Sequence, residues 1–74
     1  MDLRKFYIKK EPIELYKILK IDNQVQSGGE AKFVISESLV KVNGEVETRK
    51  AKKIYSGDII DFEGDLIKIV LEKK

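Results

Sequence analysis

The stretch SGGEAKFVISESLVKVNGEV, residues 27 to 46, changes from a helical pattern to a strand pattern at residue 39. It starts with Ser27, a favoured N-cap residue, and Glu30 follows at the spacing of a capping box. Apolar residues then recur every three or four positions, so the sequence predicts a helix over residues 28–38. The predicted buried stripe of this helix consists of Ala31, Val34, Ile35 and either Ser38 or Leu39.

From residue 39 onward, apolar residues alternate with polar ones, which indicates a strand. In this pattern Val40 and Val42 point inward and Lys41 points outward. The following Asn43-Gly44 pair is typical of a type I′ turn, because both central positions of that turn need a positive φ. The sequence therefore predicts a β-hairpin directly after the helix.

The residues before this stretch predict a further helix and an N-terminal strand. Pro12 suits the first turn of a helix, where its missing backbone donor has no cost, and the apolar spacing that follows predicts a helix over residues 12–20. Residues 4–10, RKFYIKK, mix aromatic and charged side chains and predict a short edge strand or an ordered arm. We expect this segment to pair with the C-terminal strand.

The residues after the hairpin complete a small sheet. Residues 45–55 contain few apolar side chains, and we expect them to form an exposed connection. Alternating apolar residues predict strands over residues 59–62 and 66–71. A chain of 74 residues can bury one modest core, so we expect one domain over residues 1–74. Its predicted class is α+β, with two packed helices on a small, mostly antiparallel and curved sheet.

The positive charge of the chain is concentrated in one segment. The formal net charge is only +2, but residues 39–57 hold five cations against two acids, whereas the other residues hold ten cations against eleven acids. The run TRKAKK, residues 48–53, carries four of the cations. Such an asymmetric charge distribution orients a polyanion on one face of the molecule. The cations that we expect on this face are Lys32, Lys41, Arg49, Lys50, Lys52 and Lys53.

Several function classes are disfavoured by what the sequence lacks. The chain has no histidine and no cysteine, and its acids form no arrangement of nucleophile and base, so we expect a binding protein without a cofactor and not an enzyme. The acids between residues 58 and 65 lack the spacing of a calcium site and indicate a solvated strand face, so no metal is expected. No apolar run has the length of a membrane span, and a cytoplasmic protein without membrane contact is expected.

Two further features have two interpretations each. Gly28 and Gly29 lower helix propensity in a first helical turn. They therefore indicate either tight packing against the other helix or a helix N-terminus that receives a phosphate on its free N–H groups. Tyr55 follows the basic run directly, and its ring either stacks on an unpaired base or packs beneath the run.

The order of these motifs resembles the S4 RNA-binding domain. The resemblance rests on Leu15-x-x-x-Leu19, on Ser27-x-x-Glu30-Ala31-Lys32 and on LVKVNGEVETRKAKKIYSGDII, and it covers residues 12–62. The fragments GGEAK and VNGEVETRK are similar, more narrowly, to the stand-alone bacterial S4-like proteins of the YaaA and YbcJ type. The sequence departs from the wider family at Gly28, where many S4 domains have an arginine.

The resemblance implies a two-helix (alpha-L) motif and a surface for structured RNA, with ribosomal RNA as the expected ligand. Basic residues of the family correspond to Lys32, Lys41, Arg49, Lys50 and Lys53, and Lys52 adjoins them. The candidate RNA-binding set also includes Ser27, Gly28, Gly29 and Asn43. We expect a monomer. The alternative function is a protein adaptor that uses the same basic face for an acidic partner.

Overall fold

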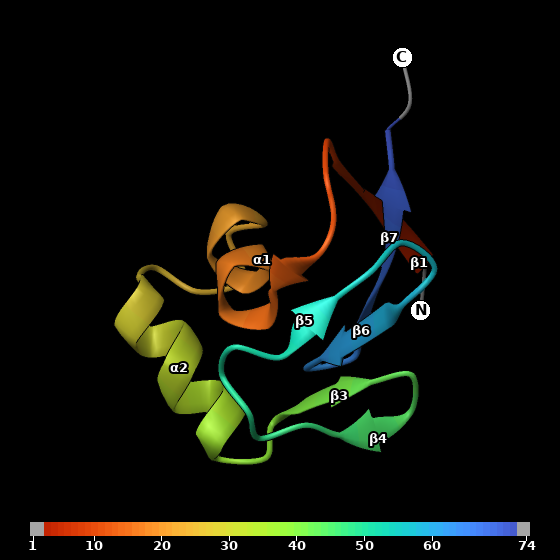
Figure 1. The fold of residues 1–74 in the computed structure, drawn as a ribbon. Helices are drawn as coiled ribbons and strands as arrows, with labels where there is room; N and C mark the ends of the chain where they lie inside the picture. The colour runs from red at the N-terminus through yellow and green to blue at the C-terminus, as the bar shows by residue number, and fades with distance from the viewer. Residues whose placement is uncertain (1–2, 73–74) are drawn as a thin grey trace.

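The computed structural model describes residues 3–72, so the ends of the predicted domain, residues 1–2 and 73–74, lie outside the described residues. Two helices lie together on one side of the molecule and most strands lie on the other (Figure 1). The elements are β1 (Leu3–Ile8), β2 (Ile13–Glu14), α1 (Leu15–Ile21), α2 (Gly28–Ser36), β3 (Val40–Val42), β4 (Glu45–Val46), β5 (Lys53–Ile54), β6 (Ile59–Phe62) and β7 (Asp65–Leu71).

Five strands form the main sheet in the order β1-β7-β6-β3-β4. The pairs β7–β6, β6–β3 and β3–β4 are antiparallel, and β1 pairs with β7 in parallel. The predicted pairing of the two terminal strands is therefore confirmed, as are the α+β class and the mostly antiparallel sheet. The two remaining strands, β2 and β5, form a separate antiparallel pair.

The core lies between the helices and the inner face of the main sheet. The alternation of each strand supplies one inward row, so Val40 and Val42 are buried while Lys41 between them is exposed. No polar or charged side chain is buried among residues 3–72. Side chains with no exposed surface come from both helices and from four strands: Leu15, Ile18, Leu19, Ala31, Ile35, Val40, Ile54, Ile60, Ile67 and Ile69.

Helix α1 begins later than the sequence predicts. Pro12 does not lie in its first turn, because Ile13 and Glu14 pair with β5 as strand β2 before the helix starts at Leu15. The predicted start at residue 12 is therefore wrong by three residues, while the predicted helix itself is present. The apolar spacing from Ile13 onward did not separate a buried strand residue from a helical one.

Helix α2 begins where the capping motif places it. The Ser27 hydroxyl accepts a hydrogen bond from the backbone N–H of Glu30 at 3.1 Å, which confirms the N-cap. The carboxylate of Glu30 reaches one residue further back than in a capping box and accepts from the Gln26 N–H at 3.0 Å. The helix ends at Ser36, two residues before the predicted end, and Ser38 has a φ of 65°.

The hairpin that follows is confirmed, and the segment after it is more ordered than predicted. Asn43 and Gly44 have φ values of 53° and 87°, as a type I′ turn requires. Residues 45–55 are not one exposed connection, because they contain β4 and β5 and because Ile54 has no exposed surface. The prediction failed there because the partner of β5 is β2, about 40 residues earlier in the chain.

Candidate nucleic-acid interface

The cationic run TRKAKK, residues 48–53, forms the end of the connection between β4 and β5 together with Lys53, the first residue of β5, and we call this run the basic loop. Two of its carbonyls accept hydrogen bonds from the first turn of α1: Leu15 N–H donates to Lys52 O at 2.9 Å and Tyr16 N–H to Lys50 O at 3.2 Å. These bonds satisfy donors that the start of a helix otherwise leaves free. The basic loop is therefore fixed to α1 by main-chain contacts.

A carboxylate before the basic loop holds one of its cations. Glu47 accepts three hydrogen bonds from Arg49: 2.8 Å from Nε, 3.3 Å from Nη2 and 3.0 Å from the backbone N–H. The Arg49 side-chain hydrogen bond, with the charges of Arg49 and Lys52, holds the pKa of Glu47 below its ordinary value. The hydrogen bond from the guanidinium to Glu47 likewise raises the pKa of Arg49. Glu47 thus orients Arg49 and offsets part of its charge.

The lysines of the basic loop have no acidic partner among the described residues. Among residues 3–72, no ion pair involves Lys50, Lys52 or Lys53. Lys50 and Lys53 are exposed, and Lys52 is half-buried. Lys32 of α2 joins them, because its ammonium lies 4.8 Å from the ring centre of Tyr16, the residue whose backbone contacts Lys50. Lys32 and the basic loop are therefore neighbours across the start of α1.

Lys41 does not join this group. It points away from the core on β3, opposite to Val40 and Val42. Its cross-strand partners are Val46 and the acidic Asp61. The structure therefore brings together five of the six predicted cations and places Lys41 on the outer face of the sheet.

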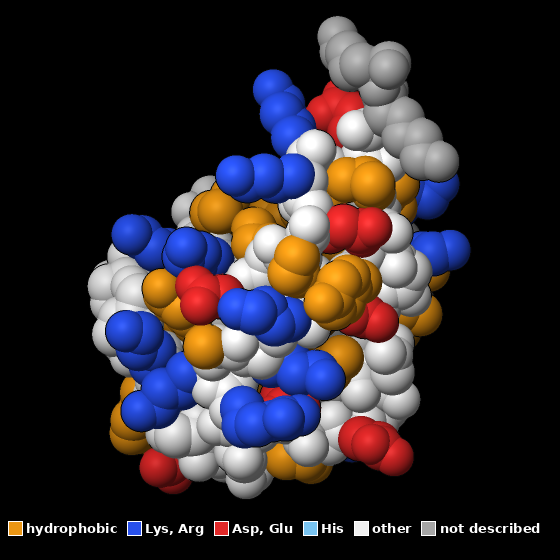
Figure 2. Space-filling view, viewed as in Figure 1, with side chains coloured by type: hydrophobic (Ala, Val, Ile, Leu, Met, Phe, Trp, Pro, Cys, Tyr) orange, Lys and Arg blue, Asp and Glu red, His pale blue; other side chains and the backbone are white. Residues whose placement is uncertain are grey.

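Figure 2 shows Lys and Arg side chains gathered over the region of the helices and β5, with few acids among them.

Asn43 is engaged within the protein. Its side-chain carbonyl accepts from the Ile59 N–H at 2.9 Å, and its amide donates to Asp58 Oδ1 at 3.1 Å. The other carboxylate oxygen of Asp58 accepts from the Tyr55 N–H at 2.9 Å. These bonds join the hairpin turn to the turn after β5. The Asn43 side chain thus uses both its amide N–H₂ and its carbonyl oxygen within the protein.

The N-terminus of α2 is open. An added Cβ at Gly28 would meet no atom within 4 Å, and one at Gly29 would meet only Ser27 Oγ at 3.8 Å. Tight packing therefore does not explain the two glycines, so the first of the two interpretations is disfavoured. Ser27 itself is occupied by capping, as its hydroxyl holds the Glu30 N–H.

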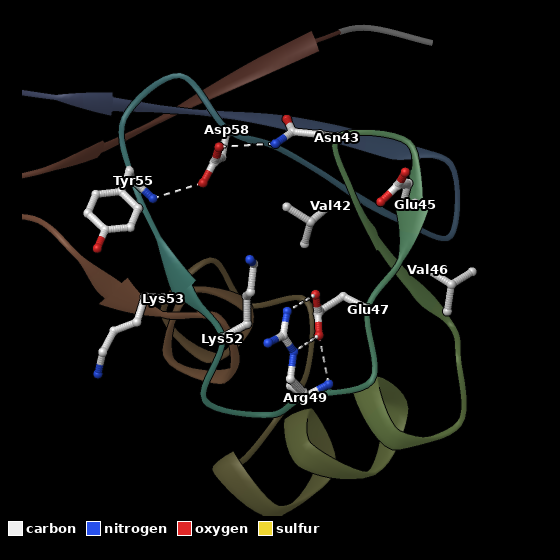
Figure 3. Close-up of a pocket in the computed structure, with 10 residues that line it drawn as sticks. All are labelled: Val42, Asn43, Glu45, Val46, Glu47, Arg49, Lys52, Lys53, Tyr55 and Asp58. Atoms are coloured by element: carbon white, nitrogen blue, oxygen red, sulfur yellow. Dashed lines mark hydrogen bonds and ion pairs between the residues drawn. The ribbon is translucent and has the colours of Figure 1, made fainter.

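A hollow of about 500 Å³ lies between the hairpin and β5 (Figure 3). A second hollow of about 370 Å³ adjoins it and is lined by Arg49, Ala51, Lys52, Lys53 and Tyr55. Lys52 extends toward the middle of the first hollow, whereas Lys53 points away from it (Figure 3). The first hollow is lined by Val42, Asn43, Glu45, Val46, Glu47, Arg49, Lys52, Lys53, Tyr55 and Asp58.

Six of these lining residues were absent from the predicted site: Val42, Glu45, Val46, Glu47, Tyr55 and Asp58. The exposed position of Tyr55, half of whose surface is accessible, was one of two interpretations of the sequence. Nothing in the sequence pairs Asn43 with Asp58, because 15 residues separate them and only the sheet brings them together.

Other kinds of site find little support in the described chain. Within residues 3–72, no group of three Asp or Glu side chains is arranged to hold a metal ion. Neither helix of this part of the chain has the length and apolarity needed to cross a membrane. The chemistry that the interface offers is therefore cationic, with one aromatic ring and a few oriented carboxylates.

The chain is similar in sequence to two bacterial proteins. The Escherichia coli (strain K12) protein YbcJ is 42% identical over 66 residues, which cover 88% of this chain and 94% of YbcJ. RlbA of Bacillus subtilis (strain 168), named a probable ribosome maturation protein, is 44% identical over 57 residues, covering 77% of this chain and 80% of RlbA.

Solved structures agree with these relatives. The solution structure of E. coli YbcJ, described as revealing an alfaL motif involved in RNA-binding, matches with a TM-score of 0.71 and 39% identity, and covers 95% of this chain and 90% of YbcJ. A pseudouridylate synthase crystal structure matches with a TM-score of 0.68 and 28% identity over 76% of this chain, but only 24% of the synthase. The model of the S4 domain matches residues 6–70. The predicted resemblance is thus confirmed, and the chain belongs to the S4 domain family.

Proposed function

We propose that this chain binds folded RNA, and ribosomal RNA in particular, through a surface that we call the RNA face. The RNA face consists of the basic loop, Lys32 and the N-terminus of α2. The observation that carries the proposal is the attachment of the basic loop to α1 by two backbone hydrogen bonds. Unpaired lysines on an ordered backbone offer phosphates a fixed pattern of charge.

The residues of the RNA face have different roles in this proposal. Lys50 and Lys53 are exposed and carry no ion pair in the described chain, so they make the strongest phosphate contacts. Arg49 contributes less, because Glu47 already occupies part of its guanidinium. Lys41 and Asn43 lie outside the RNA face, since the first faces away and the second is bonded within the protein.

The open start of α2 adds a second kind of contact. The backbone N–H groups at Gly28 and Gly29 precede the first intrahelical bond, which runs from the Ala31 N–H to the Ser27 carbonyl at 3.0 Å. The absence of Cβ atoms leaves room for a phosphate to approach these donors. Shape fit between this helix end and the basic loop would favour folded RNA over an extended strand.

The relatives support both RNA as the ligand and the ribosome as the source of that RNA. YbcJ has a motif described as involved in RNA-binding, and RlbA is named for ribosome maturation. Both match most of this chain. We propose that the chain acts in a similar way to these relatives. In this proposal it is a monomeric, single-domain RNA-binding module without a cofactor or a catalytic step of its own.

The proposal is tested by measuring affinity for ribosomal RNA as a function of salt. The Lys50→Gln, Lys53→Gln double variant should bind more weakly at low salt, and its slope of log K against log salt should be shallower by about 1.4 to 1.8. The control is the Lys5→Gln, Lys68→Gln double variant, which removes the same charge from paired residues of β1 and β7. This control should retain the slope.

Equal losses from both double variants would mean that net charge alone attracts RNA, and the RNA face would be refuted as a site. Crosslinking in cells followed by sequencing identifies the bound RNA. If no RNA is enriched while an acidic protein co-purifies, the adaptor function replaces RNA binding.

A further inference from the structure

A third hollow, of about 450 Å³, lies beside the RNA face, and we call it the outer hollow. Side chains from β2, β5, α1 and the connection between β1 and β2 contribute to it. They are Lys10, Pro12, Ile13, Glu14, Lys17 and Lys53. Lys53 also belongs to the basic loop, so the outer hollow adjoins the RNA face and brings further cations to it.

The pairing of β2 with β5 decides which side chains face the outer hollow. Ile13 and Ile54 lie opposite each other in the register, and both pack against the core. Because neighbouring side chains of a strand point to opposite faces, the next pair in the register, Glu14 and Lys53, points outward. Figure 3 agrees with this, since Lys53 points away from the first hollow. The outer hollow therefore lies on the outward face of this strand pair.

The connection that carries Lys10 is anchored at two points. At its start, the carbonyl of Ile8 accepts a hydrogen bond from the Glu72 N–H at 2.7 Å. Further along, the carboxylate of Glu11 accepts from the Ser56 N–H at 2.7 Å. Lys10 itself is exposed, and no ion pair in the described part of the chain involves it. Its ammonium is thus free for a ligand while the backbone around it is held.

The one acid of the outer hollow is paired with a lysine. The carboxylate of Glu14 lies 3.3 Å from the ammonium of Lys17. The Glu14 side chain is 30% exposed, whereas that of Lys17 is 53% exposed, so Glu14 holds Lys17 from the less accessible side. An ammonium has three donors, and one carboxylate does not use them all. With three lysines and one acid, the lining has a formal charge of +2.

The outer hollow continues the positive charge of the RNA face. Figure 2 shows Lys and Arg side chains on one face of the molecule, from β5 past α1 to the connection that follows β1. A strand of RNA carries one phosphate per nucleotide, so a strand bound at the basic loop brings further phosphates to the adjoining surface. Cations along the path of the strand neutralise these phosphates and release their counterions.

We propose that the outer hollow is a further phosphate-binding site, in which Lys10 and Lys17, together with Lys53, bind the RNA backbone where it leaves the RNA face. This inference rests on the proposed RNA binding and lengthens its contact surface. Because lysine ammonium groups bind phosphates as point charges, this site adds affinity and no selectivity for a base.

The test measures the affinity of the full chain for ribosomal RNA as a function of salt, for the Lys10→Gln, Lys17→Gln double variant. Each lost phosphate contact reduces the slope of log K against log salt by about 0.7 to 0.9, so this slope should be shallower by about 1.4 to 1.8. Affinity at low salt should fall with it. The melting temperature should stay close to the wild-type value, because both side chains are exposed.

The matched control is the Lys9→Gln, Lys20→Gln double variant. It removes the same charge from the same two segments of the chain, and both of its side chains are exposed but do not line the outer hollow. This control should retain the wild-type slope. An equal reduction in slope from both double variants would mean that the charge of this end of the molecule acts as a whole, and the site would be overturned.

Lysine acetylation of the wild-type chain, followed by mass spectrometry, reads the same contacts without a substitution. Lys10 and Lys17 should lose reactivity when ribosomal RNA is bound, whereas Lys9 and Lys20 should keep theirs. Unchanged reactivity of Lys10 and Lys17 would overturn the site, even if the double variant bound RNA more weakly.

A wild-type slope for the Lys10→Gln, Lys17→Gln variant would also overturn the site. This result would leave the proposed function intact as long as the Lys50→Gln, Lys53→Gln variant has a shallower slope than the wild type. Wild-type slopes for both double variants would refute the RNA face together with the outer hollow.

Discussion

Replacing Ile54 by alanine tests whether β5 is a structural part of the domain. Ile54 has no exposed surface and pairs with Ile13 of β2. The substitution removes three carbon groups, worth about 0.8 kcal/mol each in transfer, or roughly 2.4 kcal/mol. The cavity that remains brings the expected loss in free energy of unfolding to about 3 to 4 kcal/mol, within the usual range of about 2 to 5 kcal/mol.

Such a loss is large for a domain of this size. A chain of 74 residues has a total free energy of unfolding of roughly 4 to 11 kcal/mol. At about 4 to 8 °C per kcal/mol, a loss of about 3 kcal/mol should lower the melting temperature by roughly 12 to 24 °C. RNA affinity should fall as well, because Ile54 holds the end of the basic loop in place.

The assay is urea unfolding followed by circular dichroism, with Val46→Ala as the control. Val46 lies at the other end of the same segment and is 51% exposed, so its truncation should cost less than about 1 kcal/mol. If Ile54→Ala costs no more than Val46→Ala, residues 45–55 form the exposed connection that the sequence indicated, and the argument for an ordered basic loop is refuted.

Three further predictions concern single contacts. Gly29→Asp should leave the melting temperature equal or slightly higher, since its Cβ has room and a carboxylate suits a helix start, yet should weaken RNA binding relative to Gly29→Ala; unchanged affinity would remove the helix end from the RNA face. Arg49 lowers the pKa of Glu47 in the folded chain, so the Glu47 carboxylate stabilises the fold above its unfolded pKa near 4.5, and this stabilisation is lost as pH falls through the folded pKa. The difference in unfolding free energy between wild type and Glu47→Gln should therefore shrink below about pH 4. A difference that stays constant with pH would contradict the ion pair. Asn43→Ala should cost about 1 to 3 kcal/mol by urea unfolding, because it breaks two bonds and places alanine at positive φ, while the salt slope for RNA stays unchanged; a shallower slope would show that Asn43 contacts phosphate.

Local patterns predicted the elements that depend on local contacts. The N-cap at Ser27 and the turn at Asn43-Gly44 are decided by residues within a few positions, and both were found as predicted. The strands β2 and β5 have two residues each and exist only because distant segments meet. Their apolar residues are too few to produce a period.

The candidate site was likewise predicted where it depends on local sequence and missed where it depends on distant contacts. The cations of the basic loop appear in the sequence as a run. Whether each cation can bind a phosphate depends on its neighbours in the fold, which the run does not show. Arg49 is hydrogen-bonded to Glu47, and Lys41 lies on the outward face of β3, apart from the other cations. The Asn43–Asp58 contact requires the register of β3 against β6, which fixes the relative position of two turns.

The course of the basic loop is set by main-chain atoms, and this has a consequence for how the protein can change. Carbonyls of Lys50 and Lys52 hold the loop to α1, and every residue type has a backbone carbonyl that can accept in that position. The side chains at positions 49, 50, 52 and 53 can therefore be exchanged while the loop keeps its path. Ligand preference becomes a property that substitutions adjust independently of folding, so this small domain is a suitable scaffold for selecting new RNA specificities from a library varied at only those positions.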